Sequence, residues 1–223
     1  MKRVACIHTV YSVISDFTGQ LRAALGDDVK IHTLYDDFLA TDPADTGKFS
    51  AINHQRLRLD MQAQALTGAD MIVVSCSTLS PSVRLLRPEF NVPVVAIDDA
   101  MVREAVQKGS RIGLLATANS TVKPSHSALL AAAQAAGKDV DIQIICDEDA
   151  IRALKAGDKA THDRMVLDMA QRFTDRDVIV LAQGSMAYVE KDIERAVNLP
   201  TLSSPRFGAV ELRKALQAKG LIS

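Results

Sequence analysis

A cysteine among hydroxyl side chains follows an apolar run in the first half of the chain. The run Met71 to Val74 leads into Ser75-Cys76-Ser77-Thr78, and Ser80 with Pro81 supplies an N-cap and first turn for a helix. This order predicts a buried parallel strand, a tight turn and a helix. Cys76 would then lie at the carboxyl end of the strand, where helix N–H groups favour bound anions and a thiolate. Such a thiol could act as an acid, a base or a nucleophile on a bound carboxylate.

The same pattern occurs a second time, 107 or 108 residues later. Residues 177–186 repeat residues 70–79, with Gln183 in the place of Cys76. Residues 162–169 match residues 54–61 at five of eight positions, residues 111–117 match residues 3–9, and Asn198-Leu199-Pro200 matches Asn91-Val92-Pro93. A constant offset over these segments indicates a duplicated domain.

Strand and helix signals alternate along both halves, which predicts an α/β fold with parallel sheets covered on both faces. We expect two doubly wound halves related by a pseudo-twofold axis, with an active-site cleft between them. The first half would comprise residues 1–100 plus a C-terminal helix at about 205–223, and the second residues 101–204. The polar stretch 35–49 contains Pro43 and Gly47, and we expect a surface loop there, with a lid as the alternative.

Composition narrows the class of protein. A formal net charge of -1 gives no sign of a nucleic-acid or membrane partner. Three cysteines without paired spacing argue against disulfides and a CxxC metal site, which favours a cytoplasmic setting. No apolar run approaches the roughly 18 residues of a membrane-spanning helix. HExxH, Walker and GxGxxG motifs are absent from the sequence, so we expect no metal.

Ligands of open parallel sheets bind outside the carboxyl ends of the strands. The polar residues expected there are the candidate site residues. Cys76, Gln183 and His8 are the candidate catalytic residues, and Thr9, Ser12, Ser77, Thr78, Thr117, Ser120, Thr121, Gly184 and Ser185 are the candidate substrate-binding residues.

Three motifs resemble the aspartate/glutamate/hydantoin racemase superfamily. Residues 179–187 resemble the second cysteine motif of hydantoin racemases, residues 75–78 resemble the first, and residues 114–123 resemble the segment between them. The resemblance implies cofactor-independent chemistry at the α-carbon of a small carboxylate or amino-acid derivative, and a homo-oligomer. It gives Cys76 the role of one acid/base thiol. Gln183 replaces the second thiol, and an amide has no exchangeable proton at usable pH, although it can donate a hydrogen bond.

Each candidate also has a purely structural interpretation. A free cysteine after an apolar run is usually a small core residue, and the hydroxyl residues could simply cap helices. His8 could be structural, bind a carboxylate, or serve as the missing second base. Three functions therefore stay open: a racemase or isomerase with one thiol, a decarboxylase or lyase with Cys76 as proton donor, and a binding protein without catalysis.

Overall fold

The computed structural model of the chain describes residues 2–26, 29–218 and 220. Within these ranges, only the backbone is described for Ser12, Arg206, Ala209, Val210, Glu211, Ala215 and Ala218. The chain divides into two compact units: unit 1 is residues 1–99 with 205–223, and unit 2 is residues 100–204.

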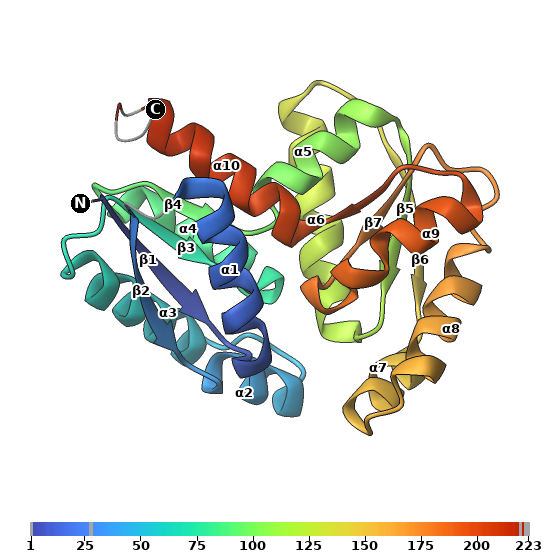
Figure 1. The fold of residues 1–223 in the computed structure, drawn as a ribbon, viewed down its shortest axis with the longest axis horizontal. Coiled ribbons are helices and arrows are strands. Elements are labelled where there is room, and N and C mark those ends of the chain that lie inside the picture. The colour runs from blue at the N-terminus through green and yellow to red at the C-terminus, as the bar shows by residue number, and fades with distance from the viewer. Residues whose placement is uncertain (1, 27–28, 219, 221–223) are drawn as a thin grey trace. The chain divides into compact units, whose positions relative to one another are not determined.

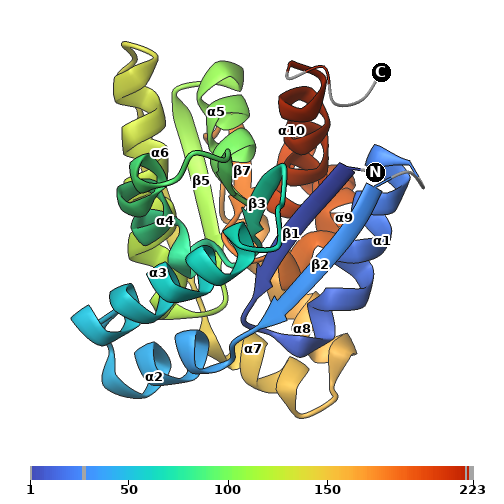
Figure 2. The same ribbon diagram turned by 90° about the vertical axis from the view of Figure 1, so that its left-hand side faces the viewer.

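Unit 1 contains a four-stranded parallel sheet (Figures 1 and 2). Its strands are β1 (Lys2–His8), β2 (Val29–Tyr35), β3 (Met71–Val74) and β4 (Val94–Ala96), in the order β2-β1-β3-β4. The central strand β3 is buried at every position, as its unbroken apolar run requires of a strand covered on both faces.

Helices cover both faces of this sheet. On one face, α1 (Ile14–Leu25) and α10 (Ser204–Ala218) pack with alternate residues of β1 and β3. The other face is covered by α2 (Phe38–Thr46), α3 (Ala51–Ala65) and α4 (Ser80–Leu86), and Figure 2 shows α3 and α4 on the side opposite α1. The connections include three short 3₁₀ turns, η1 (Tyr11–Val13), η2 (Ser77–Leu79) and η3 (Arg87–Glu89).

Unit 2 repeats this topology with the strand order β6-β5-β7-β8. The strands are β5 (Arg111–Ala116), β6 (Asp141–Cys146), β7 (Val178–Leu181) and β8 (Thr201–Ser203). One face packs against α7 (Glu148–Lys155), α8 (Lys159–Ala170), η4 (Gly184–Val189) and α9 (Glu190–Val197). On the other face α6 (Asn119–Ala135) contacts β5 and β6, and α5 (Asp99–Lys108) begins at the boundary between the units.

The α/β class and the duplication into two parallel sheets are therefore confirmed, and two local predictions are wrong. The stretch 35–49 contains the helix α2, because Leu39 and Pro43 turn into the core and Gly47 ends the helix in the left-handed conformation. Ser80 is not an N-cap: it lies within α4, and its hydroxyl donates to Asp98 Oδ1 at 2.6 Å. The last helix, α10, begins at Ser204, and its predicted continuation through residues 219 and 221–223 lies outside the described residues.

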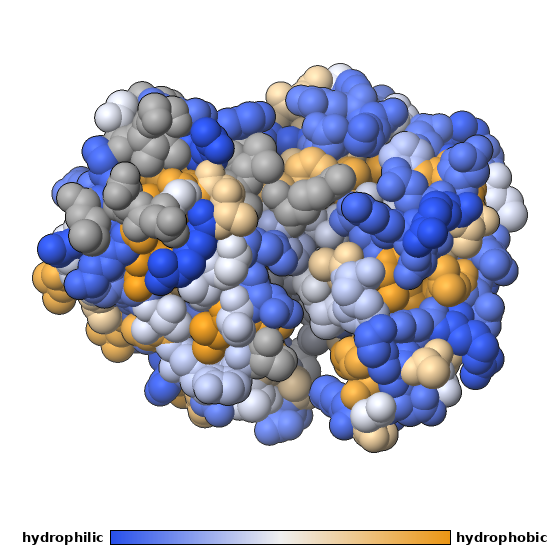
Figure 3. Space-filling view, viewed as in Figure 1, coloured by the Kyte–Doolittle hydropathy of each residue, from blue (hydrophilic) through white to orange (hydrophobic). Residues whose placement is uncertain are grey.

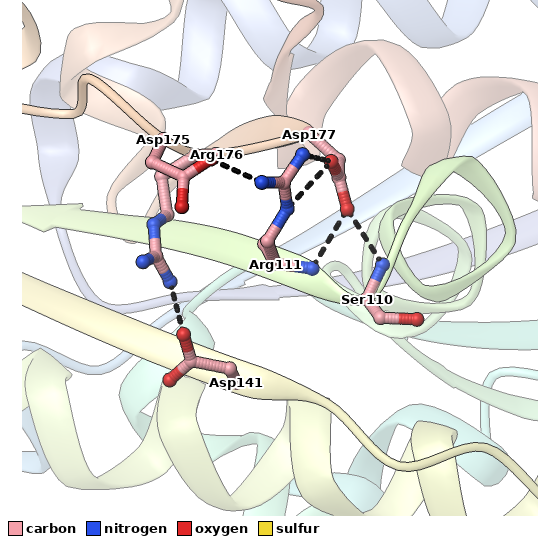
Figure 4. Close-up of polar contacts among 6 residues, drawn as sticks. All are labelled: Ser110, Arg111, Asp141, Asp175, Arg176 and Asp177. Atoms are coloured by element: carbon pink, nitrogen blue, oxygen red, sulfur yellow. Dashed lines mark hydrogen bonds and ion pairs between the residues drawn. The ribbon is translucent and has the colours of Figure 1, made fainter.

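The amino ends of the unit 2 strands are held by an ion-pair network (Figure 4). Asp177 accepts hydrogen bonds from the backbone N–H groups of Ser110 and Arg111 at 3.0 and 2.9 Å, and from the Arg111 guanidinium. Gly109 lies against this aspartate, and a Cβ atom there would come within 2.2 Å of Asp177 Cβ. These bonds, led by the Arg111 side chain, lower the pKa of Asp177 to about 2.

The surface is mainly polar on the face drawn in Figure 3, with apolar side chains scattered among charged ones. Among the described residues, no helix is both long enough and apolar enough to cross a membrane.

Candidate active site

The backbone brings Cys76 and Gln183 to equivalent positions in the two sheets. Ile7 pairs with Val74 between β1 and β3, and Leu115 pairs with Leu181 between β5 and β7. Two residues beyond each pair, the same register sets Thr9 beside Cys76 and Thr117 beside Gln183.

Hydrogen bonds just beyond the strands support this equivalence. Ser75 N–H donates to the Ile7 carbonyl at 3.0 Å, and Ala182 N–H donates to the Leu115 carbonyl at 2.9 Å. Cys76 and Gln183 both have extended backbones, with φ and ψ of −108° and 117° for Cys76 and −128° and 139° for Gln183, and each precedes a 3₁₀ turn. The two positions therefore differ in their side chains and share their backbone conformation.

In unit 2, the amide of Gln183 is bound on both of its ends by one residue. Thr117 N–H donates to Gln183 Oε1 at 2.8 Å, and Gln183 Nε2 donates to Thr117 Oγ1 at 3.0 Å. Thr117 is fully buried, so these two bonds hold the amide against the end of β5.

In unit 1, the corresponding threonine lacks such a partner. Thr9 is 3% exposed, and its Oγ1 makes no hydrogen bond to any described residue. Cys76 is half-buried and packs against the apolar cluster beneath α3 and α4. The cysteine side chain is too short, and has too few polar atoms, to form the pair of hydrogen bonds that Gln183 makes with Thr117 in unit 2.

His8 lies at the end of β1 but on the other face of the sheet. Its ring packs edge-on against Phe17 of α1 with centroids 5.6 Å apart, and its Nδ1 lies 2.7 Å from Ser75 Oγ. Alternation along the strands puts His8 and Ser75 on the α1 face, whereas Cys76 belongs to the α3 face. Burial lowers the pKa of His8 to about 4, so the ring is neutral at pH 7.

The remaining candidate residues have varied surroundings. Ser77 is buried and begins η2, and Thr78 follows it half-buried. Thr121 uses its hydroxyl to donate to the Ala118 carbonyl at 2.8 Å, which is a structural bond at the start of α6. Ser120 and Gly184 are exposed, Ser185 is half-buried, and the side chain of Ser12 lies outside the described part of the chain.

Sequence reasoning missed a buried acidic residue at the end of β4. Asp98 is 1% exposed, its Oδ1 accepts from Ser80 Oγ at 2.6 Å and from Arg84 at 3.0 Å, and its Oδ2 has no described partner. Burial raises the pKa of Asp98. Arg84 also binds Asp99, to which Arg87 donates as well. The only sequence signal was the adjacent pair of aspartates directly after a short apolar run.

A second missed cluster joins β2 to α3. Asp36 follows β2 and pairs with Arg56, whose guanidinium lies 5.1 Å from the centre of the Phe38 ring. Burial, together with a hydrogen bond to Asp36, raises the pKa of Asp60 to about 7. Strand order was needed to bring Asp36 next to α3, so the linear sequence gave no indication of this cluster.

The thiols of Cys6 and Cys146 both have raised pKa values. Burial raises the pKa of Cys6 to about 12, and burial with the neighbouring Glu148 and Asp147 raises the pKa of Cys146. Among the described residues, no group of three or more His, Cys, Asp or Glu side chains could hold a metal ion.

Solved structures of several racemases share the fold of this chain over nearly its full length. A profile of the family described as Asp/Glu/Hydantoin racemase matches residues 9–212. Glutamate racemase isoform RacE1 from Bacillus anthracis matches 100% of this chain and 84% of its own, with a TM-score of 0.75 and 18% identity. An aspartate racemase from Picrophilus torridus matches 97% and 95%, with a TM-score of 0.74 and 15% identity.

Allantoin racemase from Klebsiella pneumoniae matches 100% of this chain and 90% of its own, with a TM-score of 0.70 and 18% identity. A search of curated proteins finds no match. At these identities, the solved structures show that the fold is shared.

Proposed function

The chain belongs to the Asp/Glu/hydantoin racemase family and is therefore an enzyme of the isomerase class, and we propose that it works with a single catalytic thiol, Cys76. The proposed reaction is proton transfer, without a cofactor, at the α-carbon of a small carboxylate or amino-acid derivative. The observation that carries this proposal is the contrast between Cys76 and Gln183, which occupy equivalent backbone positions.

Gln183 is unsuited to move a proton. An amide neither gains nor loses a proton near neutral pH, and both its oxygen and its nitrogen are already bound to Thr117. Cys76 has the chemistry that Gln183 lacks, because a thiol can lose its proton and the resulting thiolate is a base. In this proposal the thiolate takes the α-proton, and the electron pair moves onto the adjacent carbonyl oxygen.

The second proton comes from solvent in this proposal. His8 is neutral at pH 7 and lies on the opposite face of the sheet from Cys76, so its position does not favour it as the second acid. Water protonates the carbanion on the other face, and the Cys76 thiol returns its proton to the resulting hydroxide. The second proton transfer is then the slower one, because water is a weaker acid than a thiol.

Decarboxylation is the second candidate, favoured by the same single thiol. Loss of carbon dioxide leaves a carbanion that needs only one proton, and Cys76 could supply it. A second acid would then be unnecessary, and the presence of Gln183 in place of the second thiol would be compatible with the reaction.

Proton NMR in deuterium oxide separates these reactions. The unmodified enzyme is incubated with amino acids, 5-substituted hydantoins and substituted malonates. The proposal predicts that deuterium enters the α-position of one class with loss of optical purity. Release of carbon dioxide from a malonate would replace the isomerase proposal with the lyase, and absence of both reactions throughout the panel would contradict catalysis at carbon.

A further inference from the structure

A buried carboxylate ties the turn that carries Cys76 to the neighbouring strand. We propose that Asp98 is a positioning residue for the thiol: through its hydrogen bond with Ser80, it fixes the turn formed by residues 76–80. This inference rests on the proposed function, because it gives the means by which the thiol is held in place for proton transfer. Asp98 Oδ1 accepts from Ser80 and Arg84, and its Oδ2 has no described partner, so the effect on the thiol passes through Ser80.

Cys76 and Asp98 lie side by side at the carboxyl ends of β3 and β4. Val74 pairs with Ala96, and Ile97 N–H donates to the Val74 carbonyl at 3.1 Å, so the register continues beyond this pair. Two residues past the pair, the register sets Asp98 beside Cys76. Both side chains belong to the face that α3 and α4 cover, because residues two apart on a strand share a face.

The turn between Cys76 and Ser80 is short. Leu79 N–H donates to the Cys76 carbonyl at 3.1 Å, and α4 begins at the next residue, Ser80. Ser80 is fully buried, and its hydroxyl donates to Asp98 Oδ1 at 2.6 Å. Because so few residues separate Ser80 from Cys76, an anchor at Ser80 restricts the backbone that carries the thiol.

Arg84 holds the Asp98 carboxylate in this position. Its guanidinium donates to Asp98 Oδ1 at 3.0 Å and to Asp99 Oδ1 at 2.9 Å. Asp98 is almost completely buried, and burial raises its pKa. The hydrogen bonds from Ser80 and Arg84 offset part of the cost of burying an acid here. Its unsatisfied Oδ2 is a further cost, and such exceptions often lie at functional sites.

The second repeat lacks this anchor, as it lacks the thiol. Ala187 stands in the place of Ser80, and Pro205 stands in the place of Asp98. Neither alanine nor proline has a side chain that can form a hydrogen bond. The anchor is therefore present beside the thiol and missing beside the amide of Gln183.

Alkylation by iodoacetamide, followed at each cysteine by mass spectrometry, tests the anchor without a substrate. Ser80→Ala removes the hydrogen bond and keeps the carboxylate, so it should loosen the turn and speed alkylation of Cys76 about tenfold. Cys6 lies in the core and Cys146 lies in unit 2. Their rates should change by less than about twofold, because the loosening is local.

Two substitutions at Asp98 separate the hydrogen bond from the charge. Asp98→Asn removes the charge and keeps an oxygen that accepts from Ser80, so alkylation of Cys76 should stay near the unmodified rate. Asp98→Ala removes both, and it should match Ser80→Ala. Ser203→Ala is the matched control: it removes the hydrogen bond that Ser203 donates to Glu190 in unit 2, and it should leave Cys76 alkylation unchanged.

Turnover then connects the anchor to catalysis. Ser80→Ala should lower kcat for α-proton exchange about tenfold, because a displaced thiol no longer lies in line with the α-proton. KM should change by less than about twofold, because the hydrogen bond that is lost is not one to the substrate.

Four results would overturn the assignment: unchanged alkylation of Cys76 in Ser80→Ala, an equal rise at Cys6, Asp98→Asn behaving like Asp98→Ala, and faster alkylation with unchanged kcat. An equal rise at Cys6 would mean that the whole fold has loosened. Failure of the proposed function looks different. In that case the alkylation results hold, but the unmodified protein exchanges no α-proton in the substrate panel.

Discussion

The carboxyl ends of the two sheets share a backbone and differ in their chemistry. Thr9 and Thr117 occupy equivalent positions, as do Cys76 and Gln183. In unit 2 this pair is closed by two hydrogen bonds, whereas in unit 1 it consists of a thiol and a hydroxyl without a partner among the described residues. The repeat therefore has the same backbone at these positions in both halves, and places a thiol there only in unit 1.

Unsatisfied polar atoms mark the same contrast. At the carboxyl end of unit 1, His8 Nε2, Thr9 Oγ1 and Asp98 Oδ2 are buried without a partner in the described part of the chain. Buried polar groups are normally hydrogen-bonded, and exceptions often lie at functional sites. In the second repeat, Ala116 stands in the place of His8, and Pro205, which follows unit 2 in the chain and belongs to unit 1, stands in the place of Asp98. The second repeat therefore lacks two of these three groups.

The largest stability difference is expected at His8. Its pKa is lowered by burial from 6.5 to about 4, so between these values the unfolded chain takes up a proton that the folded chain does not. Stability should fall by about 3 kcal/mol as the pH decreases from 6.5 to 4. His8→Asn can keep a hydrogen bond to Ser75 and cannot titrate, so it should lose this pH dependence. Urea unfolding of both proteins at pH 7 and pH 4.5 measures this change in the free energy of unfolding. An equal change for the unmodified protein and His8→Asn would contradict burial of a neutral ring.

The two threonines give the most direct comparison of the units. Thr117→Val removes the hydroxyl that accepts from Gln183 Nε2 and should cost about 1 kcal/mol. Thr9→Val removes a buried hydroxyl without a described partner and should be neutral or stabilising. Chemical denaturation of both variants shows which substitution costs more stability. A greater loss at Thr9 would mean that its hydroxyl is bound within the folded chain.

A smaller difference in stability between the two units is expected at the amino ends of the sheets. Asp177 is bound by two backbone N–H groups and a guanidinium (Figure 4), whereas Asp70 accepts from Arg3 N–H at 2.8 Å and the Arg3 guanidinium donates to the Thr67 carbonyl. Asp177→Asn should therefore destabilise the protein more than Asp70→Asn at pH 6. Because the pKa of Asp177 is lowered to about 2, its contribution is present above pH 4 and is lost as the pH falls through 2. A difference that persists at pH 2 would contradict this origin.

Much of the fold was predictable because hydrophobic patterns and the repeat are local properties of the sequence. The apolar runs at Met71–Val74 and Val178–Leu181 are both buried strands. The helix α2 was missed because Pro43 and Gly47 are read as loop residues, whereas tertiary packing buries Pro43 and places Gly47 at the helix end. Ser80 was misassigned because a buried carboxylate, Asp98, competes for its hydroxyl.

The candidate site was predictable in position and less so in detail. The repeat located Cys76 and Gln183 and named Thr9 and Thr117, but their pairing depends on strand register, which the sequence does not state. His8 was placed at the correct strand end, whereas the face on which its ring lies follows from packing against Phe17. The partners Asp36, Asp60 and Asp98 come from separate elements and required the folded structure.

We propose above that Cys76 transfers the α-proton and that Gln183, at the equivalent position, does not. This claim is tested by measuring the rate of α-proton exchange into deuterium oxide for Cys76→Ala and Gln183→Ala side by side, with the substrate that the unmodified enzyme accepts. Loss of the acid/base group should lower the rate by about 10²- to 10⁴-fold in Cys76→Ala, and Gln183→Ala should lose less than tenfold. Equal losses, or an active Cys76→Ala enzyme, would contradict the account.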